Sequence, residues 1–228
     1  LRGMKGSPYD GGHRVPFFLR WPGGGLDAPR DVERVTANVD FMPTMLDLCG
    51  APVPEGRTFH GKSVAPLLYG KGEGWADRAL VTDSQRLTNP VKWRQSAVMT
   101  DRWRLVNGKE LYDAPADLEQ RNDVAEQHPE VVARLREEYE KWWEIVSAQF
   151  EEEIPLSLGA DPAKVTTLTC HDWRNDNCDC PWNQSHIRQG QIANGYWEVQ
   201  VEADGDYAIE LRRWPESQSR PLTAGIEG

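Results

Sequence analysis

The stretch RQSAVMTDRWRLVNGKELYD (residues 94–113) decides the fold of the central part of the chain. Apolar and polar residues alternate along it, which is typical of β-strands with one covered face. Asn107 and Gly108 form a dipeptide that favours a tight hairpin turn. We therefore expect strand structure over 94–106 and over 109–113. RALVTDSQ (78–85) has the same character, so the three segments predict a small antiparallel meander.

A helix is predicted directly after the meander, over PEVVARLREEYEKWWEIVSAQF (129–150). Proline is well suited to the first turn of a helix, and Pro129 is at that position. The spacing of the apolar residues predicts one stripe along the helix, made of Val131, Leu135, Tyr139, Trp142 and Val146. This stripe is expected to cover one face of the meander and to complete an α+β unit.

The N-terminal region contains KGSPYDGGHRVPFFLRWPGG (5–24), a glycine-rich turn with a lysine at its mouth. The turn leads into VPFFLRW (15–21), which is almost entirely apolar and predicts a strand covered on both faces. Residues 1–34 contain six Lys or Arg against four Asp or Glu. A small anionic ligand could therefore bind there.

A second, shorter helix is predicted over FMPTMLDLC (41–49). Asp40 is suited to cap its N-terminus and Gly50 to end it. Met42, Met45, Leu46 and Cys49 fall on one face, so Cys49 is expected to be a buried apolar residue.

Composition limits the remaining alternatives. The 228 residues are 39% hydrophobic, which is enough for a packed core. The formal net charge of −10 argues against general nucleic-acid binding. No apolar run approaches the roughly 20 residues of a membrane-spanning helix. The sequence begins with Leu1 and contains no recognisable signal peptide, and we interpret it as a piece of a longer protein.

Beyond residue 150 the pattern predicts strands again, over KVTTLTC (164–170), NGYWEVQVEA (194–203) and GDYAIELRRW (205–214). Each alternates at period two, and Asn-Gly or Asp-Gly dipeptides lie beside them. A β-sandwich module, or part of one, is expected. A carbohydrate-binding or interaction module in 151–228 remains an alternative function, because it would use exposed aromatic rings.

A cluster of metal-ligating residues occurs in the same region, within CHDWRNDNCDC (170–180). Cys170, His171, Cys178 and Cys180 are ligand types that zinc accepts. Their spacing differs from the usual pairs of zinc ligands, however. A disulfide from Cys170 to Cys178 or Cys180 is the favoured interpretation.

Four motifs, in order, resemble those of type I sulfatases of the alkaline-phosphatase superfamily. Residues 1–24 resemble the family's closing motif, in which a lysine and small residues precede Tyr-Glu-Gly-Gly-x-Arg-Val-Pro; here Asp10 replaces the glutamate. VDFMPTMLDLCGAPVP (39–54) and GKSVAPLLYG (61–70) resemble the next two motifs. KELYDAPADLEQRNDVAEQHPEVVARL (109–135) resembles the stretch before the family's C-terminal helix.

The resemblance implies an architecture in three parts. Residues 1–75 would be the end of an alkaline-phosphatase-like α/β core. Residues 76–150 would form an α+β C-terminal subdomain with a small antiparallel sheet and one long helix. Residues 151–228 would be a β-rich accessory module.

The resemblance also implies hydrolysis of sulfate esters of aryl compounds or carbohydrates by the parent protein. Family members use a formylglycine, made from Cys or Ser in a Cys/Ser-x-Pro-x-Arg signature, and a calcium ion. Cys49 begins CGAP and Cys178 begins CDCP, so neither fits that signature, and the calcium ligands are expected upstream. The 228 residues alone are expected to be inactive, and the parent protein is expected to be periplasmic or secreted.

Three residues of the first motif are site candidates. The resemblance implies that Lys5 contacts the sulfate oxygens, where a fixed ammonium would stabilise developing charge. His13 occupies a variable position and is a candidate substrate contact or general acid, or a structural histidine. Arg14 is a candidate second anion contact, or an ion-pair partner that orients the turn. A phosphodiesterase or phosphonate hydrolase of the same superfamily is the alternative enzyme.

Overall fold

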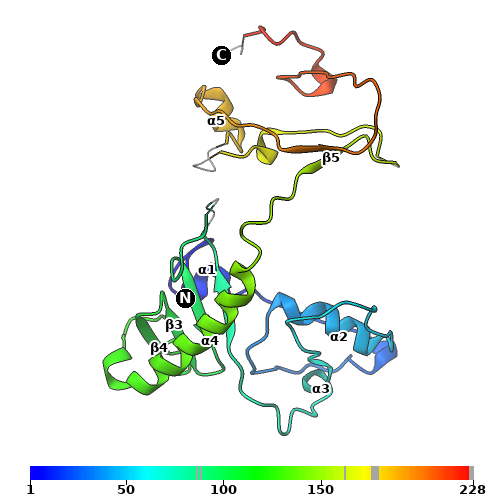
Figure 1. Ribbon diagram of the computed structural model, residues 1–228. Coiled ribbons are helices and arrows are strands. Elements are labelled where there is room, and N and C mark those ends of the chain that lie inside the picture. The colour runs from blue at the N-terminus through cyan, green and yellow to red at the C-terminus, as the bar shows by residue number, and fades with distance from the viewer. Residues whose placement is uncertain (86, 88, 162, 176–179, 226–228) are drawn as a thin grey trace. The chain divides into compact units, whose positions relative to one another are not determined.

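The computed structural model describes residues 1–85, 87, 89–161, 163–175 and 180–225. The chain divides into two compact units (Figure 1). The first unit comprises residues 1–85 and 90–149, and the second contains residues 150–228. The finer division of the first unit at residue 75 stays a prediction.

The first unit is built on a four-stranded antiparallel sheet with strand order β1-β2-β3-β4. Its strands are β1 (Leu80–Asp83), β2 (Ser96–Met99), β3 (Trp103–Val106) and β4 (Glu110–Asp113). Asn107 and Gly108 adopt φ values of 50° and 67° at the β3–β4 turn, which confirms the predicted hairpin. The predicted meander is therefore present.

The segment that we expected as one strand over 94–106 forms two, β2 and β3. Between them the N–H of Thr100 donates to the carbonyl of Trp103 at 2.9 Å. The hydroxyl of Thr100 accepts from the N–H of Trp103, also at 2.9 Å. The turn contains neither Gly nor Pro, and Asp101 alone is a weak turn signal.

One face of the meander is covered by helix α4 (Pro129–Ser147), as the apolar stripe predicts (Figure 1). Leu135 and Tyr139 of α4 are fully buried against residues that alternate along the strands: Val98, Leu105 and Leu111. The ring of Tyr139 also stacks on Trp93, with centroids 3.7 Å apart. Burial of these apolar side chains is the main source of stability on this face.

The opposite face of the meander contacts the N-terminal turn. Ala97, Val106 and Tyr112 form a second buried cluster, against which Tyr9 packs. Because successive strand residues point to opposite faces, Arg104 of β3 shares this face with Tyr112, its partner on β4. The N-terminal turn includes the short helix α1 (Asp10–His13).

The prediction of a strand over residues 15–21 is wrong. The segment has no regular secondary structure, and its described pairing is an isolated bridge between Trp21 and Leu26. The side chains of Phe17 and Phe18 are 58% and 91% exposed. A strand covered on both faces needs neighbouring strands and covering layers, and the described residues provide neither for this segment.

Helix α2 (Phe41–Leu48) confirms the shorter predicted helix, and Gly50 ends it with a φ of 62°. Helix α3 (Ala65–Leu68) packs beside it. Cys49 is exposed, contrary to prediction. On the predicted apolar face of α2, Met45 and Leu46 are half-buried while Met42 is 51% exposed, so the described residues cover this face only in part.

Asp40 does not cap α2 with its side chain, which corrects a second expectation. Its buried carboxylate instead forms an ion pair with Arg78. It also accepts the N–H groups of Ala37 and Lys62, each at 2.9 Å. Burial, the largest single influence, raises the pKa of Asp40, but Arg78 and the two N–H groups together hold that pKa below its usual value. Asp40 thus links three segments.

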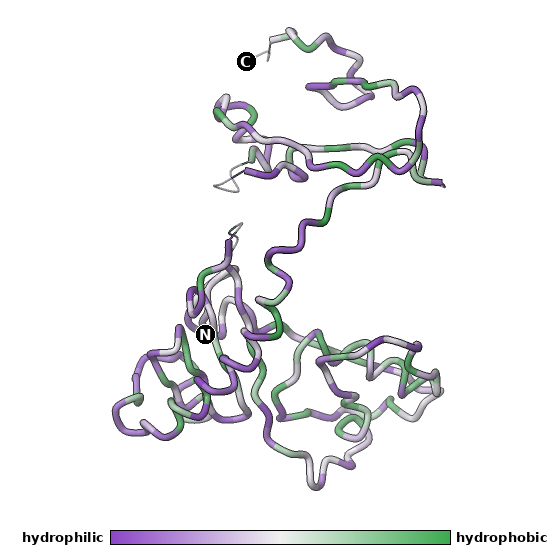
Figure 2. Tube along the Cα trace, in the orientation of Figure 1, coloured by the Kyte–Doolittle hydropathy of each residue, from purple (hydrophilic) through white to green (hydrophobic). Residues whose placement is uncertain are grey.

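The second unit contains a two-stranded parallel sheet of β5 (Leu156–Leu158) and β6 (Val199–Val201), and helix α5 (Gln184–Arg188). No described residue of 150–228 is buried. The strands predicted over 164–170 and 205–214 do not form, and apolar residues of the last segment are exposed: Ile209 by 85% and Leu211 by 66%. Figure 2 shows hydrophobic residues in both units. Alternation of apolar and polar residues does not make a strand without a partner strand and a covering layer.

Among the described residues, no helix has both the length and the apolar character that crossing a bilayer requires.

Candidate functional site

The turn that carries Lys5 folds back on itself. The N–H of Ser7 donates to the carbonyl of Met4 at 2.8 Å, and the N–H of Gly11 donates to the carbonyl of Arg2 at 2.7 Å. Gly3 and Gly6, on either side of Lys5, have φ values of 90° and 88°. L-residues other than glycine rarely adopt such values, so these two glycines set the shape of the turn.

Gly11 and Gly12 have a different role, because they are the residues of α1 that lie against this turn. A Cβ at Gly11 would lie 2.5 Å from the carbonyl oxygen of Arg2, and one at Gly12 would lie 2.2 Å from that of Ser7. Both distances are shorter than side-chain contacts allow. The two glycines are therefore required for close backbone approach, while the positive φ values belong to Gly3 and Gly6.

Lys5 itself is exposed at the tip of this turn. Its ammonium forms no hydrogen bond or ion pair with any residue that the structure describes. A lysine in this state is a compact cation that is available to an anionic ligand.

Asp10 anchors the turn to the meander. It is 2% exposed, and its Oδ1 accepts from Nε of Arg104 at 2.9 Å. Its N–H donates to Oε1 of Gln120 at 2.7 Å. Arg104 lies on β3 and Gln120 follows β4, so one aspartate joins three segments that are distant in sequence.

A cluster of Arg2, Tyr9, Glu110 and Tyr112 forms a second set of contacts on the same face. Tyr9 donates to Oε2 of Glu110 at 2.8 Å, and the hydroxyl of Tyr112 donates to the same oxygen. The guanidinium of Arg2 lies 3.8 Å from the ring centroid of Tyr9 and donates to the hydroxyl of Tyr112 at 3.1 Å. Burial, and then the Glu110 carboxylate, raise the pKa of Tyr112 above its usual range, so that its hydroxyl remains a donor.

His13 and Arg14 both lie close to Asp10. Nε2 of His13 is 3.9 Å from Oδ1 of Asp10 and 3.3 Å from the carbonyl oxygen of Pro8. Burial lowers the pKa of His13, and the nearby Asp10 opposes this effect only in part. Nη1 of Arg14 is 3.9 Å from Oδ2 of Asp10, and its side chain is 54% exposed. Their roles as substrate contacts stay predictions.

Arg104, Gln120 and Tyr112 were not among the residues that the sequence indicated. The sequence contained a signal for two of them. Alternation along the strands places Arg104 and Tyr112 on the face of the meander opposite the one that the helix covers. A charged residue on such a face is ordinarily exposed to solvent, so the pattern identified the face but not the buried partner of Arg104. Nothing in the sequence pointed to Gln120, which lies in a loop and has a φ of 49°.

The cysteine cluster lies in the second unit. Cys170 is a thiol, and its Sγ is 3.4 Å from the carbonyl oxygen of Pro181. Because Cys170 is a free thiol, the predicted disulfide from it to Cys178 or Cys180 is not formed. Cys178 itself lies outside the described residues. His171 lies in the short 3-10 turn Cys170–Asp172.

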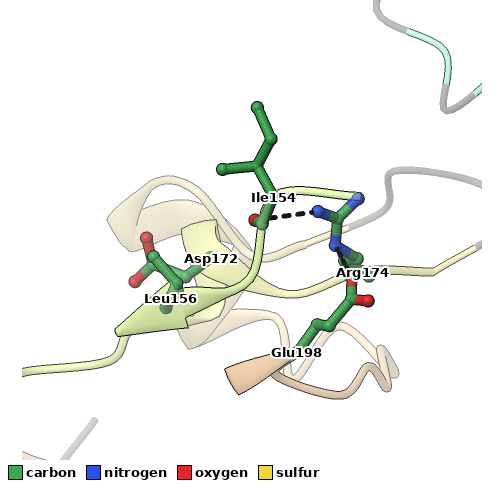
Figure 3. Close-up of a pocket in the computed structure, with 5 residues that line it drawn as sticks. All are labelled: Ile154, Leu156, Asp172, Arg174 and Glu198. Atoms are coloured by element: carbon green, nitrogen blue, oxygen red, sulfur yellow. Dashed lines mark hydrogen bonds and ion pairs between the residues drawn. The ribbon is translucent and has the colours of Figure 1, made fainter. Parts of the chain in front are cut away.

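A small pocket in the second unit is lined by Ile154, Leu156, Asp172, Arg174 and Glu198 (Figure 3). Nε of Arg174 contacts Oε2 of Glu198 at 2.6 Å, and its Nη2 donates to the carbonyl of Ile154 at 3.2 Å. The cation of this pocket is therefore already paired, and we assign no chemistry to it.

The described residues do not fit the calcium site that the sulfatase resemblance implies. No group of three or more His, Cys, Asp or Glu comes close enough within them to hold a metal ion. The formylglycine signature is likewise missing from the sequence around Cys49 and Cys178. We therefore derive no catalytic step through either group.

Comparisons with known proteins identify the family to which residues 5–144 are similar. That range matches the family model described as "N-sulphoglucosamine sulphohydrolase, C-terminal". Human steryl-sulfatase is 37% identical over 92 residues, which are 40% of this chain and 16% of that protein. An N-acetylgalactosamine-6-O-sulfatase of Bacteroides thetaiotaomicron is 31% identical over 150 residues, which cover 60% of this chain and 28% of that protein.

A solved structure described as a 2-O GAG sulfatase has a TM-score of 0.37 and 22% identity. The likeness covers 50% of this chain and 26% of that one. The chain spans less than a third of the length of the relatives described above. Because the family model covers more than half of the chain, the assignment rests on that sequence match: the chain belongs to the sulfatase family, and residues 5–144 correspond to its C-terminal region.

Proposed function

We propose that the complete protein carrying this chain hydrolyses sulfate esters, and that Lys5 contacts the sulfuryl oxygens of the substrate. The observation that supports this role is the state of Lys5. It is an exposed cation without a partner among the described residues, on a turn that Asp10 anchors to the meander. The family match also begins at this residue.

The chemistry of a sulfate ester suits such a cation. Cleavage of the sulfur–oxygen bond develops negative charge on the leaving oxygen and on the sulfuryl group. A preorganised ammonium stabilises that charge without having to reorganise during the reaction. The chain as a whole carries a net charge of −10, but residues 1–34 contain six Lys or Arg against four Asp or Glu, and this local positive charge would steer an anionic substrate toward Lys5.

Other parts of the complete protein would supply the remaining groups. Family members generally use calcium and formylglycine, and we infer that residues outside this chain contribute them. The isolated chain is then expected to be inactive. Export of the complete protein to the periplasm or beyond stays a prediction.

We propose an aryl sulfate or a sulfated carbohydrate as the substrate class. The name of one relative, an N-acetylgalactosamine-6-O-sulfatase, supports a sulfated carbohydrate. The name of the other, a steryl-sulfatase, supports a sulfate ester of an apolar alcohol. The choice within the class depends on loops that contact the rest of the substrate. Turnover should therefore be measured with nitrophenyl sulfate and with a sulfated monosaccharide.

The test is Lys5→Ala in the complete protein, with Lys71→Ala as the matched control. Lys71 is also an exposed lysine of the first unit. Loss of a charge contact made in the transition state should lower kcat/KM by about tenfold or more. Lys5→Arg keeps the positive charge but replaces the compact ammonium by a planar guanidinium. Its kcat/KM should therefore lie between those of Lys5→Ala and Lys71→Ala.

Two results would count against the proposal. If Lys5→Ala retains turnover within about twofold of the wild type, Lys5 does not contact the reacting group. If the wild-type protein hydrolyses phosphate diesters or phosphonates faster than sulfate esters, the alternative enzyme class is correct.

A further inference from the structure

We propose that the buried ion pair of Asp10 and Arg104 is a positioning device for Lys5, which fixes the Lys5 turn on the meander in the geometry that sulfate binding needs. This inference rests on the proposed function of Lys5. It adds two positioning residues that do not themselves contact the substrate.

The first step concerns the strength of the pair. Asp10 and Arg104 are 2% and 9% exposed, and the contact between Oδ1 and Nε is 2.9 Å long. Arg104 is held in turn by the meander, because its Nη1 donates to the carbonyls of Thr100 and Trp103. Water screens a buried and hydrogen-bonded pair only weakly, and removing one partner leaves an uncompensated charge.

The second step follows the chain from Asp10 to Lys5. Asp10 begins α1, and Gly11 and Gly12 of that helix press against the backbone of Arg2, Met4 and Ser7. These backbone contacts lie on both sides of Lys5. Any displacement of α1 must therefore move the turn, so the position of Asp10 determines that of Lys5.

The third step excludes a direct role for Asp10. A carboxylate that is 2% exposed cannot reach a substrate at the surface. It would also repel a sulfate group if it could. Asp10 therefore acts through the turn, and its effect on catalysis should depend on the presence of Lys5.

The test combines Asp10→Asn with Lys5→Ala in the complete protein. Asp10→Asn removes the charge with little change in volume and should lower kcat/KM for nitrophenyl sulfate by about tenfold. In the Lys5→Ala background the same change should cost less than about twofold, because coupled residues are not additive. Asp10→Glu keeps the charge and should recover most of the activity.

Arg102→Gln is the matched control. Arg102 pairs with Asp113 on the same meander, but its side chain is 59% exposed, and a surface pair of this kind contributes little. Arg104→Lys is the second variant, for the case in which Asp10→Asn does not fold. It retains the positive charge but loses the fixed fork of the guanidinium, and it should also lower kcat/KM.

Hydrogen exchange gives a readout that does not require activity. The amides of residues 3–12 should exchange faster in Asp10→Asn than in the wild type, and at the wild-type rate in Lys5→Ala. Unchanged exchange in Asp10→Asn would overturn the inference even if Lys5 proves essential. An equal loss of kcat/KM in both Lys5 backgrounds would also overturn it. If the wild type shows no sulfatase activity, the proposed function fails, while the exchange result still decides whether the pair anchors the turn.

Discussion

The two faces of the meander are built from the same four strands but serve different ends. The face under α4 buries Val98, Leu105 and Leu111 in an apolar cluster. The other face buries Arg104 and Tyr112 among hydrogen-bonding partners from the N-terminal turn. Apolar side chains can pack against each other in several orientations. Hydrogen bonds and hydrogen-bonded ion pairs require one relative orientation of their partners. The first face therefore stabilises the sheet, and the second orients the turn that carries Lys5.

Among the substitutions that test the difference between the two faces, Leu135→Ala is expected to change the free energy of unfolding most. Leu135 is fully buried under the first face, and its truncation leaves a cavity there. The free energy of unfolding of the first unit should fall by about 2–5 kcal/mol. Urea denaturation, with hydrogen exchange of β2 and β3 as a local probe, measures this change.

Ile145→Ala on the same helix is the control for that prediction. Ile145 is 55% exposed, so its truncation should cost much less. If both variants lose the same free energy of unfolding, Leu135 does not hold α4 against the meander. Added salt should leave the effect of Leu135→Ala unchanged, because no charge is involved.

Tyr112→Phe tests the polar face and should have a smaller effect. The hydroxyl donates to Glu110 and accepts from Arg2, and both partners remain partly hydrated. Its removal should lower the free energy of unfolding by about 1 kcal/mol. Tyr69→Phe is the control, since the hydroxyl of Tyr69 donates to the carbonyl of Gly24 in a solvent-exposed hydrogen bond. A loss as large as that of Leu135→Ala would contradict the proposed difference between the faces.

The sequence predicted the first unit well where local pattern and tertiary packing agree. Alternation and Asn107-Gly108 predicted the meander, and the apolar stripe predicted α4. The sequence-based prediction failed where a segment needed a neighbouring strand to pair with. The segment 15–21 is apolar enough for a buried strand, but its pairing depends on neighbours that the described residues do not contain.

The second unit teaches the same point more strongly. Residues 205–214 alternate as regularly as β3 does, yet they form no strand and none of them belongs to a buried core. Period-two alternation indicates which face of a strand could be covered. Burial under a covering layer must still supply the free energy that offsets the entropy lost when the strand is ordered. The role of Lys5 rests on its motif and stays a prediction, whereas the buried contacts of Arg104 and Gln120 with Asp10 became visible in the tertiary structure.

The smallest effect is a pH dependence that arises on the polar face. The pKa of His13 is lowered from its usual value near 6.5 in the folded state, mainly by burial. Between that value and the lower folded pKa, the unfolded chain binds more protons, so the free energy of unfolding should fall as the pH falls below about 6.5. His13→Gln should remove this part of the pH dependence, whereas His60→Gln, at an exposed histidine, should leave it intact. Denaturation at pH 7.5 and at pH 5.5 measures both. An unchanged slope in His13→Gln would mean that this imidazole is as well hydrated as His60, and that the polar face is more open than the contacts of Asp10 and His13 indicate.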